Sequence, residues 1–516
     1  MRVAFAVGEA APWCMTGGLG DVAGALPQSL QNLDADVAVF IPLYREVKRK
    51  VAAQNARLVD TGARSTVWIH GHKVVGRFFR IDHAAQLPAP IEEMPLGDDG
   101  LPVPTHARTS VRVPVFAFDC PIFFDRDGLY GHADDAVRFS AFSRAVLNCA
   151  TELMNGQPDV IHSHDWHTAL IPMFLAGPYR PLLPKTAAVL TIHNLAYQGV
   201  IGPEDLGAIG VGAEHFHAER LEFYGRVNML KGGIACADAV TTVSPRYADE
   251  IRTAEFGERL DGVLRAHSWR LSGIVNGIDV DVWNPAKDNL IAAPYSADNL
   301  AGKALCRRAL LQAAHLDPDD PHPVFGVVSR FTRQKGLDLI ADLVPWLESR
   351  SVRLLMLGQG EPALEARFTQ LGQQFPNHVR VRFAHEPGLA HMLQAGVDAF
   401  LMPSRYEPCG LSQLYAMRYG TIPIVRAVGG LRDTVVEATR STLAHGTATG
   451  FRFEHDSVAG LQWAIDSALD VFYTDQPTWR QLQHNGMTQD FSWSHSARQY
   501  LQVYRDAITR RRRHKG

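Results

Sequence analysis

The chain has 516 residues, more than one ordinary hydrophobic core accommodates, so two or more domains are expected. Hydrophobic residues make up 46% and charged residues 20% of it, values typical of a globular enzyme and not of a disordered or fibrous chain. The formal net charge of −3 gives no reason to expect nucleic acid or an anionic membrane as a partner.

Short apolar runs alternate with helical patterns through the first half of the chain. Continuous apolar runs of this length are typical of parallel strands buried on both faces. Helical patterns lie at Gly20–Asn32 and Asp134–Met154, and the stretch from Ser65 to Pro121 predicts a strand-rich insertion with antiparallel character. The predicted strands are Val3–Val7, Val37–Ile41, Val111–Phe118, Val160–His162, Ala187–Ile192 and Ala239–Val243.

The same alternation returns in the second half, after a segment without periodicity at Asn276–Lys303 that predicts an inter-domain connection. The predicted strands here are Val324–Val328, Val352–Leu357, Val379–Phe383, Ala399–Met402 and Thr421–Val425. The predicted helices are Leu337–Glu348, Glu361–Phe375 and Leu411–Tyr419. Strand–helix alternation predicts doubly wound α/β domains at residues 1–273 and 274–490.

The last part of the chain, residues 491–516, is expected to form a terminal helix and a basic tail. The helical pattern covers Ser494–Ile508, and such a helix would dock on a domain already built. The run of arginines that begins at Arg510 is expected to be solvated and frayed, as terminal basic runs usually are.

Cysteine usage and the lengths of the apolar runs predict a cytoplasmic protein. The six cysteines are scattered singly, which fits a reducing compartment and argues against a disulfide framework or a structural zinc site. The first apolar run, Val3–Val7, is shorter than the roughly 7–15 residues of a secretory signal. No stretch approaches the roughly 18 apolar residues of a membrane span.

A glycine-rich loop, Thr16-Gly17-Gly18-Leu19-Gly20, follows the first predicted strand. A turn of this kind lets the backbone approach a ligand and presents helix N–H groups to an anion. The spacing is not GxGxxG, so the dinucleotide-binding fingerprint is absent. Taken alone, the loop is explained equally well as a tight turn.

Polar residues follow two more strands of the first half. His162-Ser163-His164-Asp165-Trp166-His167 could suggest a metal site, but strand geometry sends His162 and His164 to one side and His167 elsewhere. We therefore favour Asp165 as an acceptor for sugar hydroxyls and expect no metal. His193 and Asn194 end the next strand and are expected to face a cleft, with a structural histidine as the alternative.

The second half carries two further loops with chemical potential. Arg330 and Lys335 lie between a strand and a helix, where Arg as a fork and Lys as a point charge can grip a diphosphate. Glu407 precedes Pro408, and a helix is expected to begin at Gly410–Ser412, whose N–H groups can hold a phosphate. A carboxylate beside a phosphate-binding helix start suits a sugar nucleotide.

Taken in order, these segments closely resemble the family of bacterial glycogen synthases and plant starch synthases, the glucan-extending branch of the retaining GT-B glycosyltransferases. The resemblance covers nearly the whole chain. Further motifs that carry it are Glu222-Phe223-Tyr224-Gly225, Asn276-Gly277-Ile278-Asp279 and Gly429-Gly430-Leu431-Arg432-Asp433-Thr434. It implies two Rossmann-like domains facing across a cleft, with ADP-glucose bound mainly by the second, and a C-terminal helix that returns to the first.

The resemblance also implies roles for residues of this chain. Arg330 and Lys335 resemble the cations that stabilise departing ADP, and Glu407 resembles the carboxylate that positions glucose. His193 resembles the residue at the anomeric carbon. Asp165, Asn194 and Asn276 correspond to sugar contacts and Tyr130 to a contact near the donor, and the remaining donor-side positions are Met15, Gly17, Gly18, Gly358, Cys409, Gly410, Leu411 and Ser412.

The implied reaction transfers glucose from ADP-glucose to the non-reducing end of an α-1,4-glucan such as glycogen or maltodextrin, with retention and without metal or cofactor. One position departs from the family pattern: the lysine of its Lys-Thr-Gly-Gly-Leu loop is Met15 here. Methionine cannot supply that positive charge. One interpretation is that Arg330, Lys335 and the helix N–H groups are sufficient to bind the donor. The other is that the donor preference or the activity has shifted.

Other functions remain possible from the sequence. UDP-glucose is an alternative donor, and a non-catalytic glucan-binding protein would fit the change at Met15. A phosphorylase would need a lysine-anchored pyridoxal phosphate site, for which no motif is present, and a nicotinamide dehydrogenase lacks its GxGxxG. Intact Arg330, Lys335, His193 and Glu407 favour the transferase.

Overall fold

The computed structural model describes residues 1–69, 71–82 and 112–513. Its internal contacts divide the chain into two units. Unit 1 comprises Met1–Thr242, Ile251–Ser272 and Ser494–Gly516, and unit 2 comprises Val243–Glu250 and Gly273–Trp493. Much of the predicted insertion at 65–121 lies outside the described residues.

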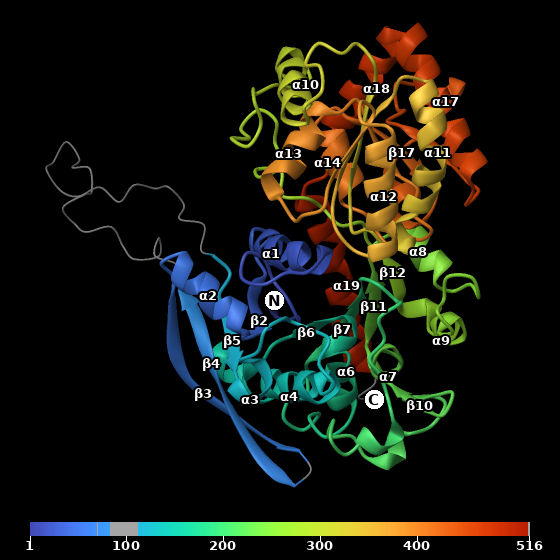
Figure 1. Cartoon of the computed structure of the whole chain (residues 1–516). Helices are drawn as coiled ribbons and strands as arrows, with labels where there is room; N and C mark the ends of the chain where they lie inside the picture. Colours follow the sequence, from blue (N-terminus) through green and yellow to red (C-terminus); the bar gives the residue numbers. More distant parts are fainter. Residues whose placement is uncertain (70, 83–111, 514–516) are drawn as a thin grey trace, which may run out of the picture. The chain divides into compact units, whose positions relative to one another are not determined.

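Unit 1 is built on a nine-stranded sheet whose central strands are parallel. In sheet order its strands are β12 (Leu271–Gly273), β11 (Ala239–Thr242), β7 (Ala187–Ile192), β6 (Val160–His164), β1 (Arg2–Ala6), β2 (Asp36–Pro42), β5 (Val115–Asp119), β4 (His72–Asp82) and β3 (Arg57–Ile69). The last two form a long antiparallel hairpin at one edge (Figure 1). The antiparallel character predicted for this region is confirmed.

Helices cover the sheet of unit 1 with apolar stripes. In the first helix, Val22, Leu26 and Leu30 are buried at intervals of four residues, as expected for one face of an amphipathic helix. The helices are α1 (Gly18–Gln31), α2 (Arg45–Ala53), α3 (Pro121–Phe124), α4 (Asp135–Leu153), α5 (Asp165–Thr168), α6 (Leu170–Ala176), α7 (Met229–Cys236) and α9 (Asp261–Ala266). A small sheet that was not predicted adds β8 (Val200–Ile201), β10 (Arg226–Asn228) and β9 (Glu222–Phe223).

Unit 2 has a six-stranded sheet in which every pair is parallel. In sheet order the strands are β15 (Val379–Arg382), β14 (Arg353–Leu357), β13 (Val324–Val328), β16 (Ala399–Met402), β17 (Ile422–Arg426) and β18 (Phe451–Phe453). Alternate residues enter two different cores: Phe325 packs on one face and Val324 on the other. Burial on both faces explains why these strands are continuously apolar in sequence.

The helices of unit 2 lie on both faces of its sheet. They are α10 (Ala301–Ala313), α11 (Leu337–Ser349), α12 (Pro362–Gln374), α13 (Pro387–Gly396), α14 (Ser412–Arg418), α15 (Gly429–Thr434), α16 (Arg440–Ala444), α17 (Val458–Thr474) and α18 (Gln476–Thr488). A further helix, α8 (Pro245–Glu250), belongs to this unit because Glu250 accepts from the Gly429 N–H and Asp433 accepts from the Arg246 N–H.

The terminal helix α19 (Trp493–Arg513) ends in unit 1, as predicted. Tyr504 is fully buried there, and its hydroxyl lies 2.8 Å from His162 Nδ1. The expectation of a solvated, frayed basic run is wrong for its first residues. Arg511 forms an ion pair with the buried Asp238 at 2.7 Å, because the helix continues through the arginines and places them against unit 1.

Candidate functional site

Each sheet has a point where the chain reverses the direction in which it adds strands. In unit 1 this point lies between β1 and β6, and in unit 2 it lies between β13 and β16. Ligands of open α/β sheets bind beyond the carboxyl ends of strands at such points. The residues that follow these four strands are therefore the candidates in each unit.

In unit 2, Lys335 and Glu407 meet beyond β13 and β16. Lys335 Nζ donates to Glu407 Oε2 at 2.6 Å, and the Ser404 hydroxyl donates to the same oxygen at 2.9 Å. The Glu407 side chain is 7% exposed and that of Lys335 is 17% exposed. The carboxylate is thus held by one cation and one hydroxyl.

The loops that carry this pair approach each other closely. Gly336 has a φ of 65°, and a Cβ at that position would lie 2.0 Å from the carbonyl oxygen of Pro403. A side chain is therefore excluded where the loop after β13 passes the loop after β16. Gly358, at the end of β14, is constrained in the same way, since its Cβ would lie 1.8 Å from the Ser329 carbonyl oxygen.

The Glu407 backbone is anchored from the neighbouring helix starts. Gly430 N–H donates to the Glu407 carbonyl at 3.1 Å, and the Ser244 hydroxyl donates to the Pro408 carbonyl at 2.8 Å. These contacts hold Glu407 between α8 and α15. They also connect the Gly429–Thr434 motif to Glu407 through the backbone.

Further predicted residues of unit 2 lie in or directly after the loops that carry this pair. The Arg330 guanidinium is exposed and forms no ion pair within the described part of the chain. Cys409 is buried, and its pKa is raised to about 12 by burial. Gly410, Leu411 and Ser412 form the start of α14, where the first N–H groups lack intrahelical acceptors.

Asn276 is also buried, and its Oδ1 has no hydrogen-bond partner among the described residues. A buried amide oxygen without a donor is uncommon in folded proteins. This atom is thus suited to accept a hydrogen bond from a ligand hydroxyl.

In unit 1, Glu9 organises the glycine-rich loop that follows β1. This residue is 2% exposed, and its Oε2 accepts from Thr16 N–H at 2.7 Å and from the Thr16 hydroxyl at 2.8 Å. Its Oε1 accepts from Gly20 N–H at 3.2 Å. Gly17 and Gly18 lie between these anchors at the start of α1, and Met15 is 37% exposed.

Glu9 was not singled out from sequence. The available signal was an acid directly after a buried strand, a position that either a ligand contact or a structural role would explain. Burial raises its pKa, while the bonds from Thr16 oppose that shift.

Asp165 lies in the left-handed region, with a φ of 52°, at the junction of β6 and α5. Its Oδ1 accepts from the His193 N–H at 2.7 Å and the Asn194 N–H at 3.4 Å. Burial raises the Asp165 pKa to about 7. The structure therefore gives this carboxylate a positioning role for the loop after β7, in addition to any contact with a sugar.

His193 also pairs with a second histidine. Its Nε2 lies 3.0 Å from His164 Nδ1, so one ring donates and the other accepts. Burial lowers the His193 pKa to about 3, and burial places the His164 pKa well below its usual value. Both rings are neutral at pH 7, so His193 would act as a hydrogen-bonding group and not as a cation.

Tyr130 stacks on His167, with ring centroids 4.4 Å apart. The Tyr130 hydroxyl is buried and has no hydrogen-bond partner within the described residues. His167 thus packs away from the His162 and His164 pair, as strand geometry predicted. In the described part of the chain, no group of three His, Cys, Asp or Glu residues could hold a metal ion.

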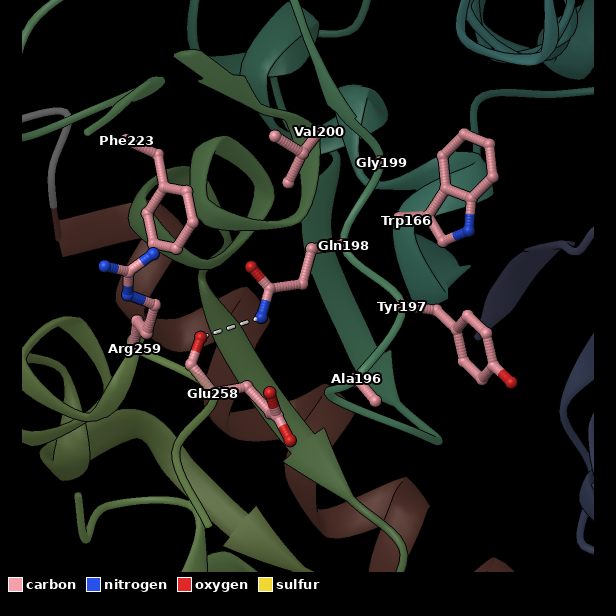
Figure 2. Close-up of a pocket in the computed structure, with 9 residues that line it drawn as sticks. All are labelled: Trp166, Ala196, Tyr197, Gln198, Gly199, Val200, Phe223, Glu258 and Arg259. Atoms are coloured by element: carbon pink, nitrogen blue, oxygen red, sulfur yellow. Dashed lines mark hydrogen bonds between the residues drawn. The ribbon is translucent and has the colours of Figure 1, made fainter. Parts of the chain in front are cut away.

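A pocket of about 470 Å³ follows the loop of His193 and Asn194 in unit 1. Figure 2 shows Trp166 and Tyr197 on one side of the segment 196–200, and Phe223 and Arg259 on the other. Gln198 crosses to the Glu258 carbonyl, to which it donates at 3.0 Å. Aromatic faces beside amides and charges suit a ligand with apolar faces and polar edges, such as a sugar ring.

None of the helices formed by the described residues is both long and apolar enough to cross a bilayer. Family models match two parts of the chain: residues 2–266 match the starch synthase catalytic domain, and residues 312–476 match glycosyl transferases group 1. Together these parts include every predicted site residue except Asn276.

Relatives match the chain over nearly its full length. A glycogen synthase of Bacillus cereus is 40% identical over 511 residues, which cover 98% of this chain and 100% of that protein. A glycogen synthase of Koribacter versatilis is 42% identical, with 98% of each chain covered. The solved catalytic domain of starch synthase IV from Arabidopsis thaliana, bound to ADP and acarbose, has a TM-score of 0.85 and 32% identity, covering 98% of this chain and 99% of that one.

Proposed function

We propose that this chain, which belongs to the starch synthase and glycogen synthase family of glycosyltransferases, transfers glucose from ADP-glucose to the non-reducing end of an α-1,4-glucan. Glucosyl transfer in glycogen synthesis is its reaction class. The GT-B fold expected from the sequence, with two α/β units and a C-terminal helix that returns to the first, is confirmed.

The ion pair between Lys335 and Glu407 is the observation on which the donor proposal rests. Lys335 and Arg330 would bind the diphosphate, because a compact ammonium and a guanidinium fork suit phosphate oxygens. Glu407, held by Lys335 and Ser404, would accept hydrogen bonds from the glucose hydroxyls. The N–H groups of Gly410–Ser412 would hold the distal phosphate.

The reaction proposed here retains configuration by a front-face route. The bond between the anomeric carbon and the phosphate oxygen breaks as the acceptor oxygen bonds to that carbon. The acceptor proton passes to the departing phosphate oxygen. Lys335 and Arg330 would stabilise the negative charge on that phosphate. This stabilisation accelerates the reaction because the charge develops in the transition state.

Unit 1 is proposed to contact the transferred glucose and the acceptor. Neutral His193 would hydrogen-bond the sugar near its anomeric carbon, and Asp165 would fix His193 and Asn194 through their N–H groups. The aromatic pocket at Trp166 and Tyr197 is the region that we propose for the acceptor glucan.

Six free cysteines also support a proposed cytoplasmic location.

Transfer of labelled glucose to glycogen tests the proposal. Purified chain is incubated with ADP-glucose or UDP-glucose at equal concentration, with the Glu407→Ala variant as the inactive control. We expect transfer from ADP-glucose and a clear preference for it. Equal or better transfer from UDP-glucose would refute the donor assignment, and no transfer from either donor would favour a non-catalytic glucan-binding protein.

A further inference from the structure

Four arginines gather around one carboxylate in unit 1, at the end of α19. We call this the arginine cluster, and it consists of Arg180, Arg270, Arg510 and Arg511. The carboxylate is Asp238, which is 5% exposed.

Both carboxylate oxygens of Asp238 already have hydrogen-bond donors as partners. Arg511 approaches it with two nitrogens, Nη2 at 2.7 Å from Oδ1 and Nε at 3.2 Å from Oδ2. Oδ2 also accepts from the Ala188 N–H at 2.8 Å. Arg510 reaches only the Asp238 backbone carbonyl, at 3.1 Å. One guanidinium is therefore neutralised, and the others are not.

Arg180 donates to backbone carbonyls, and Arg270 donates to backbone carbonyls and also lies 3.1 Å from His267 Nδ1. Arg270 donates to the Ala235 carbonyl at 2.8 Å, in the last turn of α7, where a cation is favoured by the helix dipole. Arg180 donates to the Leu183 carbonyl at 3.1 Å and to the Thr186 carbonyl at 2.9 Å. Neither arginine has an acidic partner among the described residues.

Several guanidinium nitrogens of the cluster are buried without an acceptor. They are Nε and Nη2 of Arg180 and Nε of Arg270, within the described part of the chain. Burial lowers the pKa of both arginines, and the nearby charge of Arg511 lowers that of Arg180 further. Buried charged donors without acceptors are costly and rare, and a bound ion is one of the ordinary explanations.

An exposed aromatic ring lies beside the same guanidiniums. Trp269 is 61% exposed, and its ring lies 5.3 Å from Arg270 Cζ and 5.4 Å from Arg510 Cζ. An indole at the edge of a cationic site offers a flat surface on which a ring or apolar group attached to a bound anion can pack.

We infer that the arginine cluster binds a small oxyanion, either free phosphate or the phosphoryl group of a larger molecule. Guanidinium forks match the geometry of phosphoryl oxygens, and the ligand would supply the acceptors that Arg180 and Arg270 lack. The site is built from residues that play no part in the proposed transfer reaction. It would also fasten the end of α19, since Arg510 and Arg511 belong to that helix.

Calorimetric titration with inorganic phosphate, at constant ionic strength and with the full chain, tests this inference. We expect saturable phosphate binding by the wild-type chain that persists in Lys335→Ala, and we expect Arg180→Gln to weaken that binding about tenfold or more, as loss of a charge-assisted hydrogen bond predicts. Arg350→Gln is the matched control, because Arg350 is an exposed arginine paired with Asp466 in unit 2. It should leave phosphate affinity unchanged.

The donor site could bind phosphate as well, so Lys335→Ala is titrated in parallel. Binding that persists in Arg180→Gln and disappears in Lys335→Ala would overturn the inference, as would the absence of saturable binding to the wild type. If Arg180→Gln does not fold, Arg510→Gln replaces it, since Arg510 makes only one bond to Asp238.

Titration with phenyl phosphate distinguishes free phosphate from the phosphoryl group of a larger molecule as the ligand. Tighter binding than inorganic phosphate, with the gain lost in Trp269→Ala, would support a larger phosphorylated ligand whose ring lies on Trp269. Equal affinity of both probes would support free phosphate. Glucosyl transfer by Arg180→Gln is measured separately, so that a failure of the proposed function is not mistaken for a failure of this site.

Discussion

Lys335 Nζ lies 2.6 Å from Glu407 Oε2, although the two residues are 72 positions apart in the chain. The contact joins the loops that leave β13 and β16, the two strands on either side of the switch point in unit 2. It places the cation proposed for the donor phosphate directly against the carboxylate proposed for the donor sugar. A change at either residue should therefore affect both the chemistry and the folded state.

Glu407→Ala and Lys335→Ala are each expected to reduce kcat for glucosyl transfer by about a hundredfold or more, the effect of removing a group that stabilises transition-state charge. Each variant should fold, with a free energy of unfolding lowered by at most about 3–5 kcal/mol, because it leaves a charge in a largely buried site without its partner. Steady-state kinetics and urea unfolding measure the two effects.

The double variant Lys335→Met/Glu407→Gln separates the two effects. Both side chains of the double variant are uncharged, so no charge is left buried without a partner. Its free energy of unfolding should therefore return toward that of the wild type, while glucosyl transfer stays lost. Ser404→Ala is the milder comparison, since it removes only the hydroxyl bond to Glu407. Near-normal transfer in Glu407→Ala or Lys335→Ala would remove that residue from the proposed site.

Met15→Lys is expected to raise kcat/KM for ADP-glucose by about tenfold, the lower end of the effect of a charge-assisted hydrogen bond. Met15 is 37% exposed in a loop that Glu9 holds, so a lysine there can reach solvent or a ligand without disturbing the core. Met15→Gln, of similar length and without charge, is the matched control. An unchanged or lower kcat/KM in Met15→Lys would mean that the site works without this cation.

Asp165→Asn should make the stability less dependent on pH. The native pKa of about 7 lies above the unfolded value of roughly 4, so the native chain binds more protons between these values. Stability from this group is therefore present at about pH 4 and is lost as the pH rises through about 7. The wild type should lose up to about 4 kcal/mol more than Asp165→Asn across that range.

Urea unfolding at a series of pH values compares the two proteins directly. Asparagine keeps an oxygen that can accept from the His193 and Asn194 N–H groups, so the loop should be preserved. Parallel pH profiles for the wild type and the variant would show that Asp165 is ionised in the native chain at acidic pH.

Tyr504→Phe should lower the free energy of unfolding by about 1–3 kcal/mol, because it leaves the buried Nδ1 of His162 without a partner. It should also make α19 easier to cleave near the C-terminus, which limited proteolysis detects. Tyr473→Phe, at an exposed tyrosine of α17, is the control and should change neither property. Equal protease resistance in Tyr504→Phe would show that other contacts hold the helix.

Much of the fold could be predicted because its strands carry a local signal. Neighbouring residues Val324 and Phe325 are both apolar because they enter cores on opposite faces of one sheet. The strand β13 was therefore predicted with the bounds that the structure has. The small sheet of β8, β9 and β10 was missed. Strands of two or three residues are too short to show periodicity.

The sequence by itself determined which residue types stand at the ends of strands, and its ordered motifs indicated the reaction class. It could not determine the partners of those residues. The roles of Glu9 and Ser404 and the pairing of His164 with His193 emerged only from the structure, because an acid, a hydroxyl or a ring can occupy the same sequence position with or without a ligand role. Their roles depend on hydrogen bonds between segments far apart in the chain, and only folding brings such segments within 3 Å or so of each other.

Local and long-range features of the chain differ in the same way. The continuous apolar runs that predict parallel strands are local, so most strands of the two large sheets could be predicted from the sequence. The contact of Lys335 with Glu407 and the docking of Arg511 on Asp238 are long-range, and burial fixes them by making an unpaired charge costly. A basic run that looks solvated in sequence thus becomes part of a buried cluster once the tertiary structure supplies its surroundings.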